Sequence, residues 1–317
     1  MKTANINKMK NYYEMKSFTL KDIPNLDTCV LGALELLNRE KVPKINIPYK
    51  HPLVVGSGNA EATGKILFHD KDAIFANESN LKTKIKTKGI DGIVIISASG
   101  SKHAPIIAKK AKQHKKHITL ITTKDHSQTE KYLDKKHSHD EFIFPRQREP
   151  YTYNTSTYLG MILGKTKENP KEIYNFIKNK IDKLNLSKLR TYKRFYLIIP
   201  PKFSLIKRMF EVKFIELFGR EIARDIETSE YIKHATTVIP SKELFISFGE
   251  KNTHYGKKEN RLYIPLPKKA DFGTIIAIGY YIIGKIQSHN PYFKKNIEKY
   301  TKEASKVFNT RIGPIVE

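Results

Sequence analysis

Short apolar runs alternate along the first half of the chain with segments whose apolar residues recur at helical spacing. The runs predict buried strands at Leu53–Val55, Ile93–Ile96, Ile118–Ile121 and Glu141–Phe144. The helical patterns lie at Asp27–Arg39, Glu61–Phe68, Ala104–Gln113 and Thr155–Leu163. Strands that alternate with helices in this way are typical of a parallel sheet covered by helices on both faces.

A second block with the same alternation begins at the apolar run Arg194–Ile199. Its further expected strands are Thr236–Ile239, Leu244–Ser247 and Leu262–Pro265, and its expected helices are Ser204–Ile226, Asp271–Gln287 and Tyr292–Val307. We therefore predict an α/β protein with two doubly wound, three-layer α/β/α domains and parallel sheets. The predicted domains are residues 1–165 and 194–317, joined by a charged, largely helical linker at 166–193.

The clearest chemical signal is the segment IVIISASGSKHAPIIAKKAK at residues 93–112, in which an apolar strand enters a Ser/Gly turn that opens a helix. The hydroxyls of Ser97, Ser99 and Ser101 can donate hydrogen bonds to phosphate oxygens. Gly100 lets the backbone come close to a ligand, and the first N–H groups of a helix point outward. The turn therefore predicts a binding site for the phosphate of a small molecule.

A similar junction lies upstream, where Gly56, Ser57, Gly58 and Asn59 follow a short apolar run. It does not match the dinucleotide-binding pattern G-x-G-x-x-G, because Glu61 stands where the last glycine is needed. Two Ser/Gly junctions in one alternating block indicate adjacent parallel strands whose carboxyl ends converge on one ligand.

These two turns resemble those of the sugar isomerase (SIS) domain family, which pairs a glycine-rich turn with the pattern S-x-S-G-x-T. Lys102 stands where the family usually has threonine, and its ammonium can serve as a phosphate ligand instead. Ala60 takes the last place of the family pattern G-x-G-x-S in the first turn, where Ser57 can compensate. The two blocks resemble the tandem arrangement of phosphoglucose/phosphomannose isomerases and of the isomerase half of glucosamine-6-phosphate synthase.

The resemblance implies a cofactor-free sugar-phosphate aldose–ketose isomerase for a hexose or amino-hexose phosphate, and a homodimer whose pockets are completed across the interface. The phosphate site is expected in the first block only. The corresponding turn of the second block contains Pro200 and Pro201, which lack the N–H donors that a phosphate needs. The second block is expected to supply the catalytic groups.

Aldose–ketose isomerisation needs a carboxylate that moves a proton between C1 and C2, and an acid/base group that opens the sugar ring. In the tandem family a glutamate near the end of a long helix precedes a Lys-His pair. The resemblance assigns these roles to Glu221 and His234, with Glu216 and Glu230 as alternatives for the base. It also implies that a lysine near the C-terminus, Lys299, reaches the substrate.

Between the two blocks, the segment at residues 148–157 follows an expected strand and opens a helix. The corresponding family segment lines the sugar pocket, which implies substrate contacts for Glu149, Thr155 and Ser156. Capping of the helix explains the two hydroxyl residues nearly as well.

The formal net charge is +26, from 58 basic and 32 acidic side chains. The lysines are scattered and no nucleic-acid-binding motif is present, so we expect no nucleic-acid partner but a surface that attracts anionic substrates. No apolar run is long enough for a membrane span, and the basic N-terminus lacks the apolar stretch of a signal peptide. The single cysteine, Cys29, fits a core position and a reducing cytoplasm.

His137, His139 and Asp140 form the one histidine cluster in the sequence with ligand-like spacing. A metal site would need a further ligand from elsewhere, so we interpret the cluster as a polar loop and expect no metal.

Two other functions remain open. The same fold and pocket can serve a sugar-phosphate deaminase or deglycase. A non-catalytic sugar-phosphate sensor is favoured by the departures at Ala60 and Lys102 and by the short spacing between Glu221 and His234.

Overall fold

The computed structural model describes residues 9–235 and 242–317, and the chain divides into two compact units. The five-stranded unit comprises Arg39–Arg146 and Thr157–Lys167. The four-stranded unit comprises the chain up to Asn38, together with Gln147–Ser156 and Glu168–Glu317. In both units the predicted α/β class with parallel sheets is confirmed.

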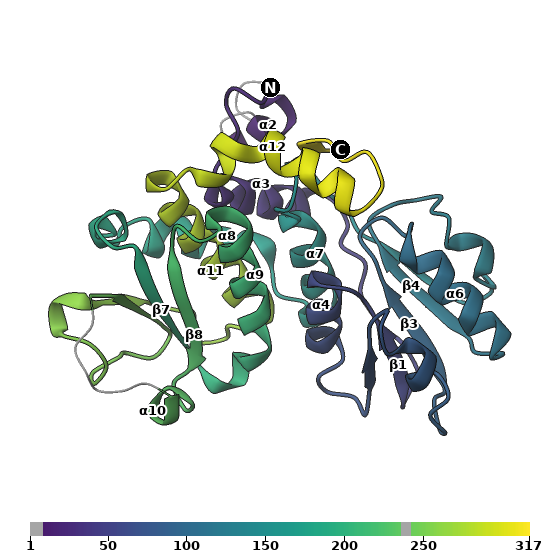
Figure 1. Ribbon diagram of the computed structural model, residues 1–317. Coiled ribbons are helices and arrows are strands. Elements are labelled where there is room, and N and C mark those ends of the chain that lie inside the picture. Colours follow the sequence, from purple (N-terminus) through teal and green to yellow (C-terminus); the bar gives the residue numbers. More distant parts are fainter. Residues whose placement is uncertain (1–8, 236–241) are drawn as a thin grey trace. The chain divides into compact units, whose positions relative to one another are not determined.

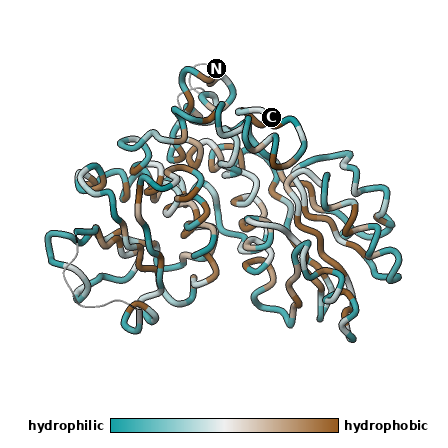
Figure 2. The backbone as a smooth tube through the Cα atoms, viewed as in Figure 1, coloured by the Kyte–Doolittle hydropathy of each residue, from teal (hydrophilic) through white to brown (hydrophobic). Residues whose placement is uncertain are grey.

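The sheet of the five-stranded unit has the order β2-β1-β3-β4-β5, and all of its strands are parallel (Figure 1). The strands are β1 (Pro52–Val55), β2 (Ile74–Ala76), β3 (Gly92–Ile96), β4 (Ile118–Thr122) and β5 (Glu141–Ile143). Its helices are α4 (Asn59–Leu67), α5 (Leu81–Lys84), α6 (His103–Gln113) and most of α7 (Thr155–Thr166). Every residue of β3 and β4 is buried, and both strands run through the hydrophobic interior in Figure 2.

The sheet of the four-stranded unit has the order β10-β9-β7-β8 and is also parallel. The strands are β7 (Arg194–Ile199), β8 (Ala223–Thr228), β9 (Leu244–Phe248) and β10 (Arg261–Ile264). The α-helices are α2 (Lys10–Ser17), α3 (Leu26–Arg39), α8 (Pro170–Phe176), α9 (Lys207–Phe218), α10 (Ile232–Ala235), α11 (Phe272–His289) and α12 (Tyr292–Val307). A short antiparallel pair joins β6 (Glu149–Pro150) to β11 (Ile315–Val316).

The units group the chain differently from the predicted domains 1–165 and 194–317, because the N-terminal segment packs with the second sheet. In α3, the Leu26 backbone N–H donates to Gln287 of α11 at 2.9 Å, and Asp27 pairs with Lys285 at 2.9 Å. The expected linker 166–193 forms α8, a π-helical turn at Ile177–Ile181 and a 3₁₀ turn at Ser187–Arg190. From residue 168 onward, that segment belongs to the four-stranded unit.

The prediction of one helix over Ser204–Ile226 is wrong. A 3₁₀ turn at Pro201–Ile206 leads into α9, which ends at Phe218, and Gly219 follows at a φ of +54°, in the left-handed region that favours glycine after a helix. The chain then enters β8, which pairs with β7 along its whole length. The strand predicted at Thr236–Ile239 lies outside the described residues. Within the described part of the chain, no helix is both long enough and apolar enough to cross a membrane.

Candidate functional site

The two Ser/Gly turns of the five-stranded unit lie at the same edge of its sheet. Strands β1 and β3 pair in parallel from Pro52↔Gly92 to Val55↔Ile95, so the turns that follow them leave side by side. Glu78 links the two turns: Ser57 Oγ donates to its carboxylate at 2.6 Å, and His103 Nδ1 of α6 lies 3.2 Å from the other oxygen. The predicted convergence of the two turns is therefore present in the structure.

The turn after β3 is compact and built around Gly100. This glycine has a φ of +55°, and its N–H donates to Ser97 Oγ at 3.2 Å. A side chain at this position would bring a Cβ within 2.5 Å of Ser127 Cβ. Ser99 Oγ and Ser101 Oγ, both half-buried, are hydrogen-bonded to each other at 2.6 Å, so two hydroxyls lie side by side in this turn.

A third loop, which follows β4, completes this edge of the sheet. Thr123 Oγ1 donates to the carbonyl of Ala98 at 2.8 Å, and Thr129 Oγ1 donates to the carbonyl of Gly100 at 2.7 Å. The buried hydroxyl of Ser127, beside Gly100, has no hydrogen-bond partner among the described residues. This loop was not predicted as part of the site, although a Ser/Thr-rich run directly after a buried strand was the signal for it.

The helices at this edge offer fewer N–H donors than the sequence suggested. Pro105, the third residue of α6, has no N–H, and the Ala104 N–H is within 3.4 Å of the Ser101 carbonyl. In the first turn of α4, Asn59 is buried with its side-chain oxygen unpartnered within the described ranges. An anion here would therefore rely on hydroxyls and on Lys102, which stands exposed at the start of α6.

In the four-stranded unit, the predicted pair Glu221 and His234 is not brought together. Glu221 is exposed in the turn before β8, and His234 is exposed in α10, after the strand has ended. A strand rises roughly 3.3 Å per residue, so the six residues of β8 hold them roughly 20 Å apart. Glu230 is also exposed, in the turn that follows β8.

Glu216 on α9 is the most enclosed of the three candidate bases, with 18% of its side chain exposed. Its carboxylate lies 2.8 Å from the ammonium of Lys213, which is completely buried and donates to the carbonyls of Thr152 and Tyr153 at 2.6 and 2.9 Å. Burial raises the pKa of Glu216 above its usual value, and the charge of Lys213 opposes the shift. Burial together with the charge of Glu216 also raises the pKa of Tyr151 and of Tyr300.

Glu149, Thr155 and Ser156 form a capping arrangement. The Glu149 side chain is buried and accepts the backbone N–H of Thr155 at 2.6 Å and that of Ser156 at 2.8 Å. Gln147 Nε2 donates to the same carboxylate at 2.9 Å. Burial raises the pKa of Glu149, and these hydrogen bonds oppose the shift. The arrangement satisfies the first N–H groups of α7, as a helix terminus requires.

Lys299 lies exposed on α12 beside an open apolar groove. The groove is lined by aromatic side chains of the same segment, among them Tyr292, Phe293, Tyr300 and Phe308.

No family model matches the sequence, and no curated protein matches it. Solved structures do match the fold. The C-terminal domain of glucosamine-fructose-6-phosphate aminotransferase from Francisella tularensis has a TM-score of 0.56 at 13% identity, over 84% of this chain and 93% of that chain. Tagatose-6-phosphate ketose/aldose isomerase from Escherichia coli has a TM-score of 0.54 at 12% identity, over 84% of this chain and 87% of that chain.

Glucosamine-6-phosphate deaminase from Thermotoga maritima has a TM-score of 0.52 at 13% identity, over 91% of this chain and 95% of that chain. At such identities the likeness establishes a shared fold that extends over most of each chain. The fold agrees with the two SIS-type α/β/α subdomains that the sequence predicts.

Proposed function

We propose that this protein binds a hexose or amino-hexose phosphate and catalyses aldose–ketose isomerisation. The observation that carries the proposal is the convergence of the turns after β1 and β3, where the hydroxyls of Ser99 and Ser101 lie side by side. The hydroxyl of Ser127 lies beside Gly100 of the same turn and has no hydrogen-bond partner within the described ranges. The proteins with a similar fold are named for work on 6-phosphates of hexoses and amino-hexoses, which supports the same class of ligand.

In this proposal the phosphate is held in the five-stranded unit by Ser99, Ser101 and Lys102. Hydroxyl hydrogens and an ammonium both donate to phosphate oxygens, and hydrogen bonds to a charged acceptor are stronger than neutral ones. The excess of 58 basic over 32 acidic side chains attracts the anion toward the protein. Glu78, whose carboxylate accepts from Ser57 in this structure, competes with the phosphate for that hydroxyl.

We assign the proton transfer to Glu216 rather than to Glu221. A carboxylate base takes the proton from C2 of the aldose, and the enediol that results receives a proton at C1. Burial raises the pKa of Glu216 above its usual value, which makes the carboxylate a stronger base, whereas Glu221 is exposed. His234 follows β8, whereas Glu216 precedes it, so we assign the opening of the ring to no residue of this pair.

Incubation of the full chain with fructose 6-phosphate in heavy water tests the reaction, with proton NMR as the measurement. An isomerase exchanges a hydrogen at C1 of the ketose and accumulates the aldose with deuterium at C2. Binding of the sugar phosphate without exchange would replace this proposal with the sensor.

Deamination of an amino-hexose phosphate is the second candidate reaction, and the similarity to a glucosamine-6-phosphate deaminase supports it. Release of ammonia from glucosamine 6-phosphate, measured with a coupled assay, identifies that activity.

We also propose a homodimer, and light scattering after gel filtration measures its mass.

A further inference from the structure

A cluster of histidines lies at the other edge of the five-stranded sheet, at the amino ends of its strands. His117 directly precedes β4, and Asp140 directly precedes β5. These strands are parallel neighbours, so the two residues are brought to the same edge, opposite the turn at residues 97–102. His139 joins them, and one ligand atom from each of the three residues lies within 4.8 Å of the other two.

Asp140 is 1% exposed, and its two carboxylate oxygens have different surroundings. Oδ2 accepts the backbone N–H of Lys136 at 2.9 Å and that of His137 at 3.0 Å. Oδ1 lies 3.0 Å from Nε2 of His117 and 4.0 Å from Nε2 of His139. Oδ1 and His117 Nε2 form an ion pair when the imidazole is protonated, but neither atom has a hydrogen bond of good geometry among the described residues. A buried polar atom without a hydrogen bond is costly, and a cation held between these atoms would satisfy both when the imidazole is neutral.

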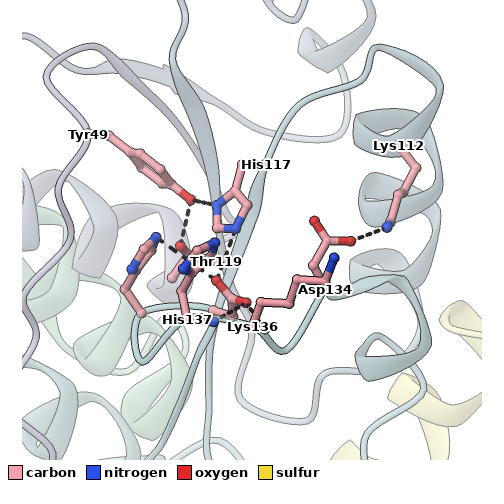
Figure 3. A network of polar contacts seen from close by, with 9 residues as sticks. Tyr49, Lys112, His117, Thr119, Asp134, Lys136 and His137 are labelled. Atoms are coloured by element: carbon pink, nitrogen blue, oxygen red, sulfur yellow. Dashed lines mark hydrogen bonds and ion pairs between the residues drawn. The ribbon is translucent and has the colours of Figure 1, made fainter.

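The ring of His117 is held by its other nitrogen. Figure 3 shows the Tyr49 hydroxyl directed at His117, where it contacts Nδ1, and at Thr119, whose Oγ1 it meets at 3.0 Å. This contact fixes the orientation of the imidazole and leaves Nε2 facing Asp140. Metal-binding histidines are typically oriented by such a contact at the second ring nitrogen.

One further feature fits a metal ligand set. The ring of His137 stacks on that of His139 at 5.2 Å and lies 5.5 Å from that of His117, close enough for a small movement to bring a fourth nitrogen.

A second group of potential ligands, Asp125, His126 and Glu130, does not share these features. Its histidine is exposed, and both oxygens of Glu130 are already paired, with the Ser127 N–H at 2.6 Å and with the Lys135 ammonium at 2.7 Å.

We propose that His117, His139 and Asp140 form a binding site for a divalent transition metal, with Zn²⁺ as the preferred ion. Two imidazoles and a carboxylate are an established zinc ligand set, and His137 or a water molecule supplies the fourth position. The site ties the loop that carries His137 and His139 to the start of β4. It lies at the edge of the sheet away from the proposed phosphate site, so it acts on stability and not on the reaction.

The test uses untagged full-length protein stripped with a chelator and then titrated with Zn²⁺ against a competing chromophoric chelator. We expect one equivalent per chain and a rise in melting temperature, and with Co²⁺ the visible absorption bands of a tetrahedral site. Asp140→Asn and His139→Gln should each weaken Zn²⁺ binding by about 100-fold or more. Tyr49→Phe, which removes only the orienting hydroxyl, should weaken it by about 10–100-fold.

His114→Gln is the matched control, because His114 is an exposed histidine of the same unit at the end of α6, and it should bind Zn²⁺ like the parent. If circular dichroism shows that Asp140→Asn does not fold, Zn²⁺ binding by His139→Gln decides, because His139 is a half-exposed loop residue. The proposal is overturned if the parent binds less than a stoichiometric amount of Zn²⁺, or if His139→Gln binds it as tightly as the parent does.

Discussion

Each of the two units has its own parallel sheet, but the units differ in the turn that follows a central strand of that sheet. In the five-stranded unit, β3 enters a turn of small hydroxyl residues around Gly100. In the four-stranded unit, β7 enters Pro200 and Pro201, and the ammonium of Lys202 donates to the Ala270 carbonyl at 3.1 Å. Prolines cannot donate, and this lysine is already engaged, so the second turn is poorly suited to an anion.

The four-stranded unit instead buries a charged pair. Lys213 is completely enclosed, with Glu216 beside it on the same helix. The sheet topology supplies an edge, while the residues of the turns and helices decide the chemistry there. We therefore expect phosphate binding in one unit and acid/base chemistry in the other, and each expectation can be tested separately.

The largest expected effect is that of Glu216→Gln, which keeps the shape of the side chain and removes the base. Isomerase turnover should fall by about 10²–10⁴-fold with little change in substrate affinity. The base must be deprotonated to act, so kcat/KM of the parent should rise as the pH passes the pKa of Glu216. Burial raises this pKa above the ordinary value of 4.5. Steady-state kinetics measures the turnover of the variant, and the same assay repeated across pH measures kcat/KM of the parent.

Glu221→Gln is the matched control for that variant, since it makes the same chemical change at an exposed position in the connection after α9. It should retain the parent's activity. The opposite result, with loss in Glu221→Gln and full activity in Glu216→Gln, would restore the base that the sequence first suggested.

Lys102→Ala tests the five-stranded unit. A hydrogen bond to a charged group contributes about 1.5–3 kcal/mol, and the exposure of Lys102 places it at the lower end, so affinity for a hexose 6-phosphate should fall roughly tenfold. Isothermal titration calorimetry measures the change. Lys109→Ala removes one exposed positive charge from the same helix and should have a much smaller effect. Equal losses in both variants would mean that only the general charge of the protein matters.

Glu149→Gln sharpens the distinction between a structural and a substrate-binding role. An amide has one acceptor oxygen for the two N–H groups that the carboxylate satisfies, so the free energy of unfolding should fall by about 1–3 kcal/mol. Chemical denaturation measures it, with the exposed Glu250→Gln expected within about 0.5 kcal/mol of the parent. A large loss of substrate affinity at unchanged stability would contradict the capping role.

Elements with a clear apolar pattern were predictable from the sequence. The strand Arg194–Ile199 and the helix Tyr292–Val307 have the predicted bounds, because a continuous apolar run and a strong helical periodicity are unambiguous. Strand β8 was missed since only Ile226 and Thr228 of its six residues are buried, as expected at the edge of a sheet, and such a mixed pattern also fits an amphipathic helix.

The candidate sites were predictable only where their residues are neighbours in sequence. Ser97 to Lys102 stand in one turn and were found, but Ser127 belongs to a different loop that only the pairing of β3 with β4 brings alongside. The same holds for the histidines. His137, His139 and Asp140 were noted as a cluster without a further ligand, and His117 reaches them through the pairing of β4 with β5.

The most direct test of the central claim is a calorimetric titration of the full chain with a hexose 6-phosphate, comparing the parent with the double variant Ser99→Ala/Ser101→Ala. The two hydroxyls lie 2.6 Å apart in the proposed phosphate site, so losing both should weaken binding by at least about tenfold while the circular dichroism spectrum stays the same. Binding of the unphosphorylated hexose should be weak for both proteins. Unchanged affinity for the phosphorylated sugar in a folded double variant would contradict the assignment of the phosphate site to the five-stranded unit.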